Sequence, residues 1–368
     1  MRAAPEVEPM YVPPGAVRGR PLAFGYVPAL DGLRAVAVLG VLLYHGGAPL
    51  SGGGFLGVNI FFVLSGFLIT SLLIGEWGQR ATIRLGRFWA RRARRLLPAL
   101  LLVLVGVAAY ARFAAGPAGM SGLRLDALSS LLYVANWHFI LGGANYFAAT
   151  AAPSPLEHMW SLAIEEQFYL VWPPVVLVLL HVGRRLRPSR RLLPVLAVAV
   201  AGAAGSALVM RLHYLHGASF TRLYEGTDTR CQDILVGAAL AVGLALWAEH
   251  RRPAPLPVPE LVVDRIHPSA GTVGLGPAPA HRRDVHRRRG PSAAPIRAWE
   301  LRTRWARVAG QVAGWAALAT VLALWARLDG PTGLLFGGGE LAVAVVVAVL
   351  LFAVVTAQAG SLARVLAV

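Results

Sequence analysis

Three ionisable side chains interrupt an otherwise apolar stretch of the chain: Asp31, Arg34 and His45. At roughly 3.6 residues per helical turn, Arg34 and His45 lie about three turns apart on one face, separated by about 16 Å along the axis. Asp31 and Arg34 are close enough in sequence to form an ion pair. Charge inside a membrane segment usually faces a cavity and marks a site. The alternative is an interfacial Asp31–Arg34 pair, with Arg34 reaching the headgroups and His45 ending the helix.

A second polar constellation lies in the segment SPLEHMWSLAIEEQFYLVWP. His158, Ser161 and Glu165 are spaced by three and four residues, so they share one helical face. The next two residues, Glu166 and Gln167, point to other faces. A histidine and a carboxylate near His45 favour general acid–base chemistry. A Ser-His-Glu triad is the alternative, and its recognition depends on three-dimensional geometry.

Two arginines in RFWARRARRLLPAL, Arg92 and Arg95, precede an apolar run. Three residues apart, their guanidinium groups can grip a phosphate in the bidentate way that arginine favours. The alternative is that they only set the membrane topology or contact anionic lipid headgroups. The sequence alone favours this alternative.

Weaker polar signals come from Ser65 in the apolar run GVNIFFVLSGFLIT and from TDTR further on. Ser65 lacks the G-x-S-x-G context of a hydrolase nucleophile. It is a candidate for the wall of a cavity or for a close-packing site. Asp228 and Arg230 flank Thr229 where a span begins, and the simplest interpretation is helix capping by Asp or Thr.

The composition defines the elements that must position these residues. The chain has 368 residues, of which 56% are hydrophobic and only 14% charged, whereas soluble domains carry about 25% charged residues. We therefore expect an all-α, polytopic transmembrane bundle with about eight or nine membrane segments. All 35 cationic side chains are arginine and the net charge is +17. Because they sit in loops between apolar runs, they indicate membrane topology rather than nucleic-acid binding.

Crossing a hydrocarbon core takes roughly 20 apolar residues in a helix. The sequence predicts spans near 29–47, 55–74, 96–113, 158–181, 192–210, 231–248, 307–327 and 340–358.

The arginine-rich loops orient these spans. The positive-inside rule places loops 75–95 and 182–191 and the basic segment 249–306 in the cytoplasm, together with the N-terminus. An even number of spans must then separate the first two loops. Segment 121–141 is therefore predicted to be re-entrant or interfacial and not a full span. A misassigned loop is the alternative.

The predicted organisation has four parts: a cytoplasmic tail over 1–25, a membrane core over 26–250, a basic Pro/Arg-rich cytoplasmic linker over 251–306, and C-terminal spans over 307–368. The tail lacks the apolar core of a cleavable signal peptide. Three linker histidines, His267, His281 and His286, are interpreted as solvated residues in a disordered segment, with a metal site as the weaker alternative. The single cysteine, Cys231, excludes an internal disulfide and a multi-cysteine metal site.

Five motifs in order resemble the acyltransferase-3 family of integral-membrane acyltransferases, of the O-acetylase type. They are LDGLRAVAVLGVLLYH, GGFLGVNIFFVLSGFLIT, RFWARRARRLLPA, HMWSLAIEEQFYL, and TDTR followed by LVGAALA, between Tyr26 and Trp247. The resemblance implies transfer of an acyl group, usually acetyl, from cytoplasmic acyl-CoA. The acceptor would be a hydroxyl of an envelope glycan, a lipid-linked sugar or a small natural product. It also implies a multi-pass protein of the bacterial inner membrane, with no permanently bound cofactor and no metal.

The resemblance assigns catalytic roles to Arg34, His45 and Glu165, and donor binding to Arg92 with Arg95. We expect His45 to act as general base towards the acceptor hydroxyl, or to carry the acyl group transiently. The remaining polar candidates are expected to support substrate or structure: Asp31, Ser65, His158, Ser161, Asp228 and Arg230.

The chain departs from the family in its long basic linker and at its end, SLARVLAV. The resemblance implies a further Gly-Ser-Tyr turn and another span, in some members followed by an extracytoplasmic esterase-like domain. We therefore expect a truncation, a fragment or a degraded copy. Two rival functions stay open: a glycan or lipid transporter that uses the same charged cavity, and an inactive remnant.

Overall fold

The computed structural model describes residues 27–113, 122–143, 154–250 and 304–367. Within these ranges the chain forms helices and no strand, which confirms the all-α prediction. The tail over 1–25, nearly all of the linker over 251–306 and its three histidines lie outside the described residues. The helices that precede the linker are α1 Pro28–His45, η1 Gly54–Leu56, α2 Gly57–Arg80, α3 Leu85–Phe113, α4 Leu123–Leu131, α5 Ala135–Leu141, α6 Met159–Gly183, η3 Pro188–Arg190, α7 Leu193–Leu215, α8 Phe220–Glu225 and α9 Thr227–His250. Those that follow it are α10 Arg304–Arg327, η4 Leu335–Gly339, α11 Glu340–Thr356 and α12 Ser361–Leu366.

Eight helices in the described ranges are long and apolar enough to cross a membrane, one for each predicted span. Several exceed the predicted bounds, because polar residues at their ends also adopt helical structure. The largest difference is α3, which begins at Leu85 where a loop was predicted up to residue 95. Arg92 and Arg95 therefore lie on a rigid helix and not in a loop.

Segment 121–141 forms two short helices, α4 with nine residues and α5 with seven. At about 1.5 Å per residue, neither can cross a hydrocarbon core of about 30 Å. The segment is therefore not a single spanning helix, and its re-entrant or interfacial placement stays a prediction. Gln167 of α6 holds it in place: its amide donates to the Tyr133 carbonyl and to Asn136 Oδ1, at 2.8 and 3.0 Å.

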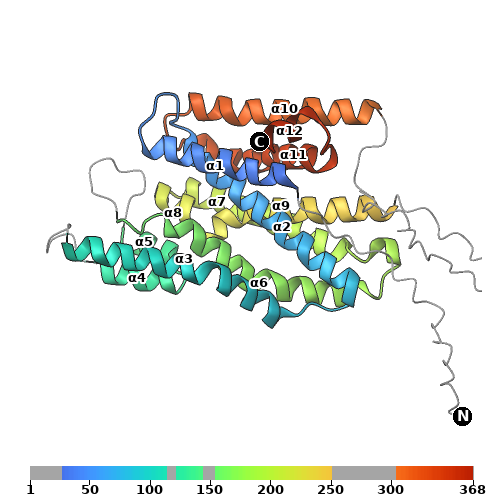
Figure 1. The fold of residues 1–368 in the computed structure, drawn as a ribbon, viewed down its shortest axis with the longest axis horizontal. Coiled ribbons are helices and arrows are strands. Elements are labelled where there is room, and N and C mark those ends of the chain that lie inside the picture. Colours follow the sequence, from blue (N-terminus) through green and yellow to red (C-terminus); the bar gives the residue numbers. More distant parts are fainter. Residues whose placement is uncertain (1–26, 114–121, 144–153, 251–303, 368) are drawn as a thin grey trace, which may run out of the picture.

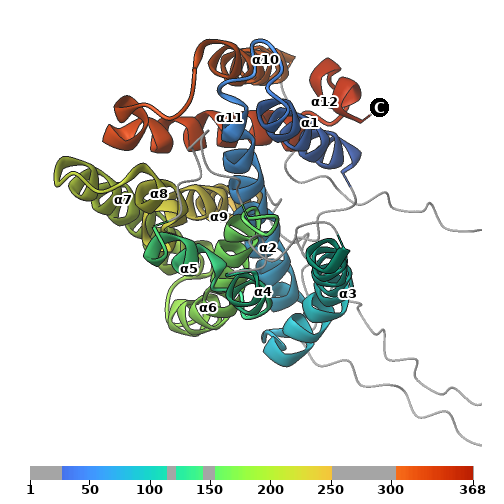
Figure 2. The same cartoon turned by 90° about the vertical axis from the view of Figure 1, so that its left-hand side faces the viewer.

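Helix α2 is the centre of the bundle. Buried residues make up 78% of its most apolar window, against 11% for α3. In Figure 2, α2 runs between a layer of α1, α10 and α11 and a layer of α6, α7 and α9. Figure 1 shows α3 along the opposite edge of the molecule from α10. A central α2 can place side chains against several other helices.

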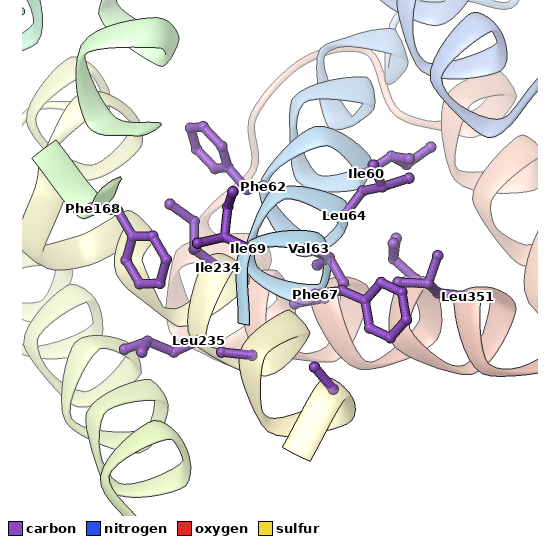
Figure 3. Packing of buried hydrophobic residues seen from close by; sticks show 14 of the residues in the cluster. Ile60, Phe62, Val63, Leu64, Phe67, Ile69, Phe168, Ile234, Leu235 and Leu351 are labelled. Carbon is purple, nitrogen blue, oxygen red and sulfur yellow. The ribbon is translucent and has the colours of Figure 1, made fainter. Parts of the chain in front are cut away.

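Close contact between α2 and α9 depends on small residues. A Cβ at Gly66 would overlap the Ile234 carbonyl, and a Cβ at Gly237 would overlap the Val63 carbonyl. Two glycines facing each other's helix let backbones approach in a way that larger residues prevent. Around this contact, apolar side chains of α2, α6, α9 and α11 pack together, among them Phe67 and Leu351 (Figure 3).

Candidate active site

A cavity of about 490 Å³ opens between α1, α2 and the first turns of α3. Its walls combine apolar residues of α2 with charged residues from all three helices. The polar lining is Asp31, Arg34, Ser71, Glu76, Gln79, Arg80, Arg91, Arg92 and Arg95. Five arginines against two carboxyl groups make the cavity electropositive, so it favours an anionic ligand.

The cavity unites three arginines that the sequence analysis had assigned to two separate motifs. Arg34 of α1 lines it together with Arg92 and Arg95 of α3. The Arg34 guanidinium also pairs with Asp31, at 2.6 Å between Nη1 and Oδ1, which confirms the predicted ion pair. Both side chains are partly exposed, so the pair contributes little to stability. Its effect is to hold Arg34 at the cavity wall.

His45 stands at the other end of α1, where His158 of α6 meets it. The two imidazole centroids are 4.7 Å apart and the rings are perpendicular. His45 Nδ1 lies 2.8 Å from the Val41 carbonyl oxygen. Because a carbonyl only accepts hydrogen bonds, Nδ1 carries a proton, and in the neutral imidazole the lone pair that a general base needs is then on Nε2.

Glu165 faces α2 and not the two histidines. Ser65 Oγ donates to Glu165 Oε1 at 2.6 Å, and the hydroxyl of Tyr169 donates to Ser65 Oγ at 2.7 Å. The ring of Tyr169, one turn further along α6, contacts Arg92 of the arginine cavity, with 3.8 Å between the guanidinium carbon and the ring centroid. The Glu165 carboxyl therefore lies on the side of the arginine cavity, whereas sequence analysis grouped it with His45 and His158.

The triad alternative finds no support in this geometry. Ser161 Oγ donates to the backbone carbonyl of His158, at 3.2 Å, and not to its ring. Among the described residues, no hydrogen bond joins Glu165 to either Ser161 or His158. A triad needs its acid to orient the histidine and its histidine to contact the serine hydroxyl.

The TDTR motif places its polar side chains in two different environments. Asp228 forms a bidentate ion pair with Arg222, at 2.9 and 2.6 Å. Thr229 Oγ1 donates to the carbonyls of Leu223 and Gly226 instead of capping the helix, so the capping interpretation is wrong for this residue. Neither Asp228 nor Thr229 contributes to the arginine cavity.

Arg230 is fully buried and is the centre of an ionic network that the sequence analysis missed. Its guanidinium lies 2.7 Å from Glu340 and 3.3 Å from Asp233, and both carboxyl groups are fully buried. Asn59 of α2 donates to Glu340 at 2.5 Å and accepts from Arg230 at 3.2 Å. The sequence did contain a signal for this network: Glu340 is the first residue of an apolar run, and a charged residue in a membrane helix needs a partner.

The arrangement can bind a phosphate-bearing ligand and transfer protons. Across the described ranges, no three His, Cys, Asp or Glu side chains come together in a way that could hold a metal ion. Arg34 in the arginine cavity and His45 of the histidine pair lie on the same helix, α1, about three turns apart. The fold and these two sites define a polytopic membrane protein with an anion-binding cavity and a candidate acid–base pair.

Comparison with known sequences identifies the family. The chain matches the family's acyltransferase domain over residues 27–367, and it therefore belongs to the acyltransferase-3 family. This confirms the resemblance drawn from the five motifs. No solved structure gives a significant match.

Three similar proteins come from Listeria, Bacillus and Staphylococcus. The peptidoglycan O-acetyltransferase OatA of Listeria monocytogenes is 43% identical over 250 residues, 68% of this chain and 38% of that protein. The putative peptidoglycan O-acetyltransferase YrhL of Bacillus subtilis is 45% identical over 59% of this chain and 33% of its own length. The O-acetyltransferase OatA of Staphylococcus aureus is 44% identical over 59% of this chain and 34% of its own. The matches thus span little more than a third of these relatives.

Proposed function

We propose that this protein is the membrane part of an O-acyltransferase that moves an acyl group, in the first instance acetyl, from acyl-CoA to a hydroxyl of peptidoglycan. The observation that carries the proposal is the cavity in which Arg34 meets Arg92 and Arg95. The relatives are named as peptidoglycan O-acetyltransferases, and this supports peptidoglycan as the acceptor. The other envelope glycans, lipid-linked sugars and natural products remain alternative acceptors in the experiment below.

The donor end of the site is the arginine cavity. CoA carries several phosphates at one end of an extended pantetheine arm and the thioester at the other. Arginines grip phosphate in fixed, bidentate geometry, and Arg92 and Arg95 present theirs from adjacent turns of one rigid helix. We place this cavity on the cytoplasmic side, where CoA is found and where the positive-inside rule puts the arginine-rich helix end.

The acceptor end is His45, on the opposite side of the membrane in this topology. Its Nε2 accepts the proton of the acceptor hydroxyl as that oxygen attacks the thioester carbonyl. The C–S bond breaks, the acyl group passes to oxygen, and CoA leaves as its thiolate. The helical rise of about 16 Å between Arg34 and His45 matches a donor whose phosphates and acyl group bind far apart.

The test is an assay of membranes that contain the full chain, with radiolabelled acetyl-CoA and a muropeptide acceptor. We expect acetyl-CoA-dependent thiol release and ester-linked label in the acceptor. Arg34→Ala and His45→Ala should lose both signals at normal protein abundance. Full activity in either variant removes this mechanism.

The same assay addresses the rival functions. A transporter or flippase would release no thiol, although it would move a fluorescent glycan or lipid across proteoliposomes. An inactive remnant would do neither. Label found in a sugar other than muropeptide would keep the reaction class and change the acceptor.

A further inference from the structure

Tyr169 of α6 joins two groups that lie on different helices. Its hydroxyl donates to Ser65 Oγ at 2.7 Å and lies 3.5 Å from Glu165 Oε2. Ser65 in turn donates to the other oxygen of the same carboxyl, at 2.6 Å. The Tyr169 side chain is almost fully buried, with 3% of its surface exposed. Tyr169 thus orients the Ser65 hydroxyl, and Ser65 in turn fixes the rotamer of the Glu165 carboxyl.

The ring of Tyr169 contacts the arginine cavity. The guanidinium carbon of Arg92 lies 3.8 Å from the centroid of this ring. Beside it, the indole N–H of Trp89 donates to the Tyr169 carbonyl, at 3.0 Å. Both contacts come from α3, the least buried of the eight long helices. Tyr169 is therefore a main point at which the arginine-bearing end of α3 attaches to the bundle.

We propose that Tyr169 is a positioning residue of the acyl-transfer site, which holds Arg92 for the donor with its ring and orients Glu165 with its hydroxyl through Ser65. The inference rests on the proposed function and deepens it. A cation–π contact restricts a long, flexible arginine to one position over the ring. The hydrogen bonds from Tyr169 to Ser65 and from Ser65 to Glu165 restrict the Glu165 carboxyl. One side chain thus links a donor-binding arginine to the Glu165 carboxyl.

The two halves of Tyr169 can be separated by substitution. Tyr169→Phe keeps the ring beside Arg92 and removes only the hydroxyl. We expect the KM for acetyl-CoA to change by less than about 3-fold, while kcat falls about 3- to 10-fold, the typical effect of one lost hydrogen bond between neutral groups. Tyr169→Leu removes the ring as well, and we expect an additional rise in KM of roughly 3- to 30-fold.

Two further variants guard against a merely structural effect. Tyr110→Phe makes the same chemical change on the exposed surface of α3 and should leave both constants unchanged. Ser65→Ala should lower kcat about as much as Tyr169→Phe does, and the double variant should be no worse than either single one, because residues of one hydrogen-bond network are not additive. Protein abundance is measured for every variant.

Each outcome supports or contradicts a defined claim. If the wild-type protein releases thiol and Tyr169→Phe matches it, the positioning role is wrong and the proposed function stands. The role is also wrong if Tyr169→Phe and Tyr169→Leu lower kcat to the same extent and raise the KM for acetyl-CoA to the same extent. It is likewise wrong if the effects of Tyr169→Phe and Ser65→Ala on kcat are additive in the double variant. If the wild-type protein releases no thiol from acetyl-CoA above empty membranes, the proposed function fails and this inference fails with it.

Discussion

The rings of His45 and His158 meet edge to face, with 4.7 Å between their centroids. His158 precedes the first residue of α6, and its burial, together with the nearby His45, lowers its pKa below the ordinary value. An unfolded chain restores a histidine pKa of about 6.5. Below that pH the unfolded state binds more protons than the folded state, so stability falls as the pH decreases.

We therefore expect the Tm of the detergent-solubilised protein to decrease as the pH is lowered from about 7.5 to about 5.5. His158→Gln removes the titrating group and should flatten this dependence. His216→Gln, at an exposed histidine after α7, should retain the wild-type slope. Equal slopes in all three proteins would show that His158 is not a source of the pH dependence.

Removal of the cavity arginines should weaken the binding of the donor. Arg92→Ala and Arg95→Ala are each expected to raise the KM for acetyl-CoA roughly 10- to 100-fold, because a charged hydrogen bond contributes about 1.5–3 kcal/mol. Arg94 is the matched control, since it lies on the same helix and its side chain donates to the backbone carbonyl of Ala90, one turn earlier. Kinetics of thiol release against acetyl-CoA concentration measure the effect. A comparable KM increase in Arg94→Ala would contradict specific donor binding by Arg92 and Arg95, because any loss of positive charge on the helix would then have the same effect.

The buried Arg230 network should dominate the stability of the bundle. Arg230→Met leaves the Asp233 and Glu340 carboxyl groups buried without their cation, and such a loss costs about 3–5 kcal/mol. We expect a clearly lower Tm in detergent and reduced abundance in membranes. Arg211→Gln, at an exposed arginine of α7, should change neither quantity.

A compensated variant separates charge from packing in this network. Arg230→Met combined with Asp233→Asn and Glu340→Gln removes the cation together with both carboxylates, and we expect much of the lost Tm to return. Persistent instability in the triple variant would instead assign the effect to the arginine's shape and hydrogen bonds.

The glycine contact between α2 and α9 makes a prediction with an internal control. Gly237→Ala places a methyl group against the Val63 carbonyl, and overpacking of this kind costs about 1–3 kcal/mol. Gly243 lies on the same helix with open space around its Cβ position. Gly243→Ala should be neutral or raise stability, since alanine favours helix over glycine. Thermal unfolding of both variants in one detergent tests the difference, and equal destabilisation would contradict the close contact.

Much of the architecture could be predicted from local pattern. Apolar runs of about 20 residues identify membrane helices, and each of the eight predicted spans has its helix. Helical spacing likewise predicted the Asp31–Arg34 pair, since partners three residues apart meet on any helix. The start of α3 was missed because an arginine-rich segment carries little hydropathy signal, although arginine favours helix as strongly as most residues.

The candidate site was predictable only as separate motifs. Nothing local indicates that Arg34 and Arg92 line one cavity, or that Ser65 contacts Glu165 across 100 residues. These contacts arise from the packing of α1, α2, α3 and α6, which a single sequence does not specify. Tyr169 was overlooked for the same reason, because an aromatic residue in an apolar helix is usually only part of the core.

The ionic network around Arg230 also constrains the order in which the protein can be made. Asn59 and its partner Glu340 are 281 residues apart in the chain. At about 5–20 residues per second, ribosomes need roughly 15–60 s to cover that distance. Arg230 can pair with Asp233 of the same helix as soon as α9 forms, whereas Glu340 is synthesised later. The contacts of Glu340 with Arg230 and Asn59 can therefore form only after α11 has been synthesised, so this network connects helices that the ribosome releases at very different times.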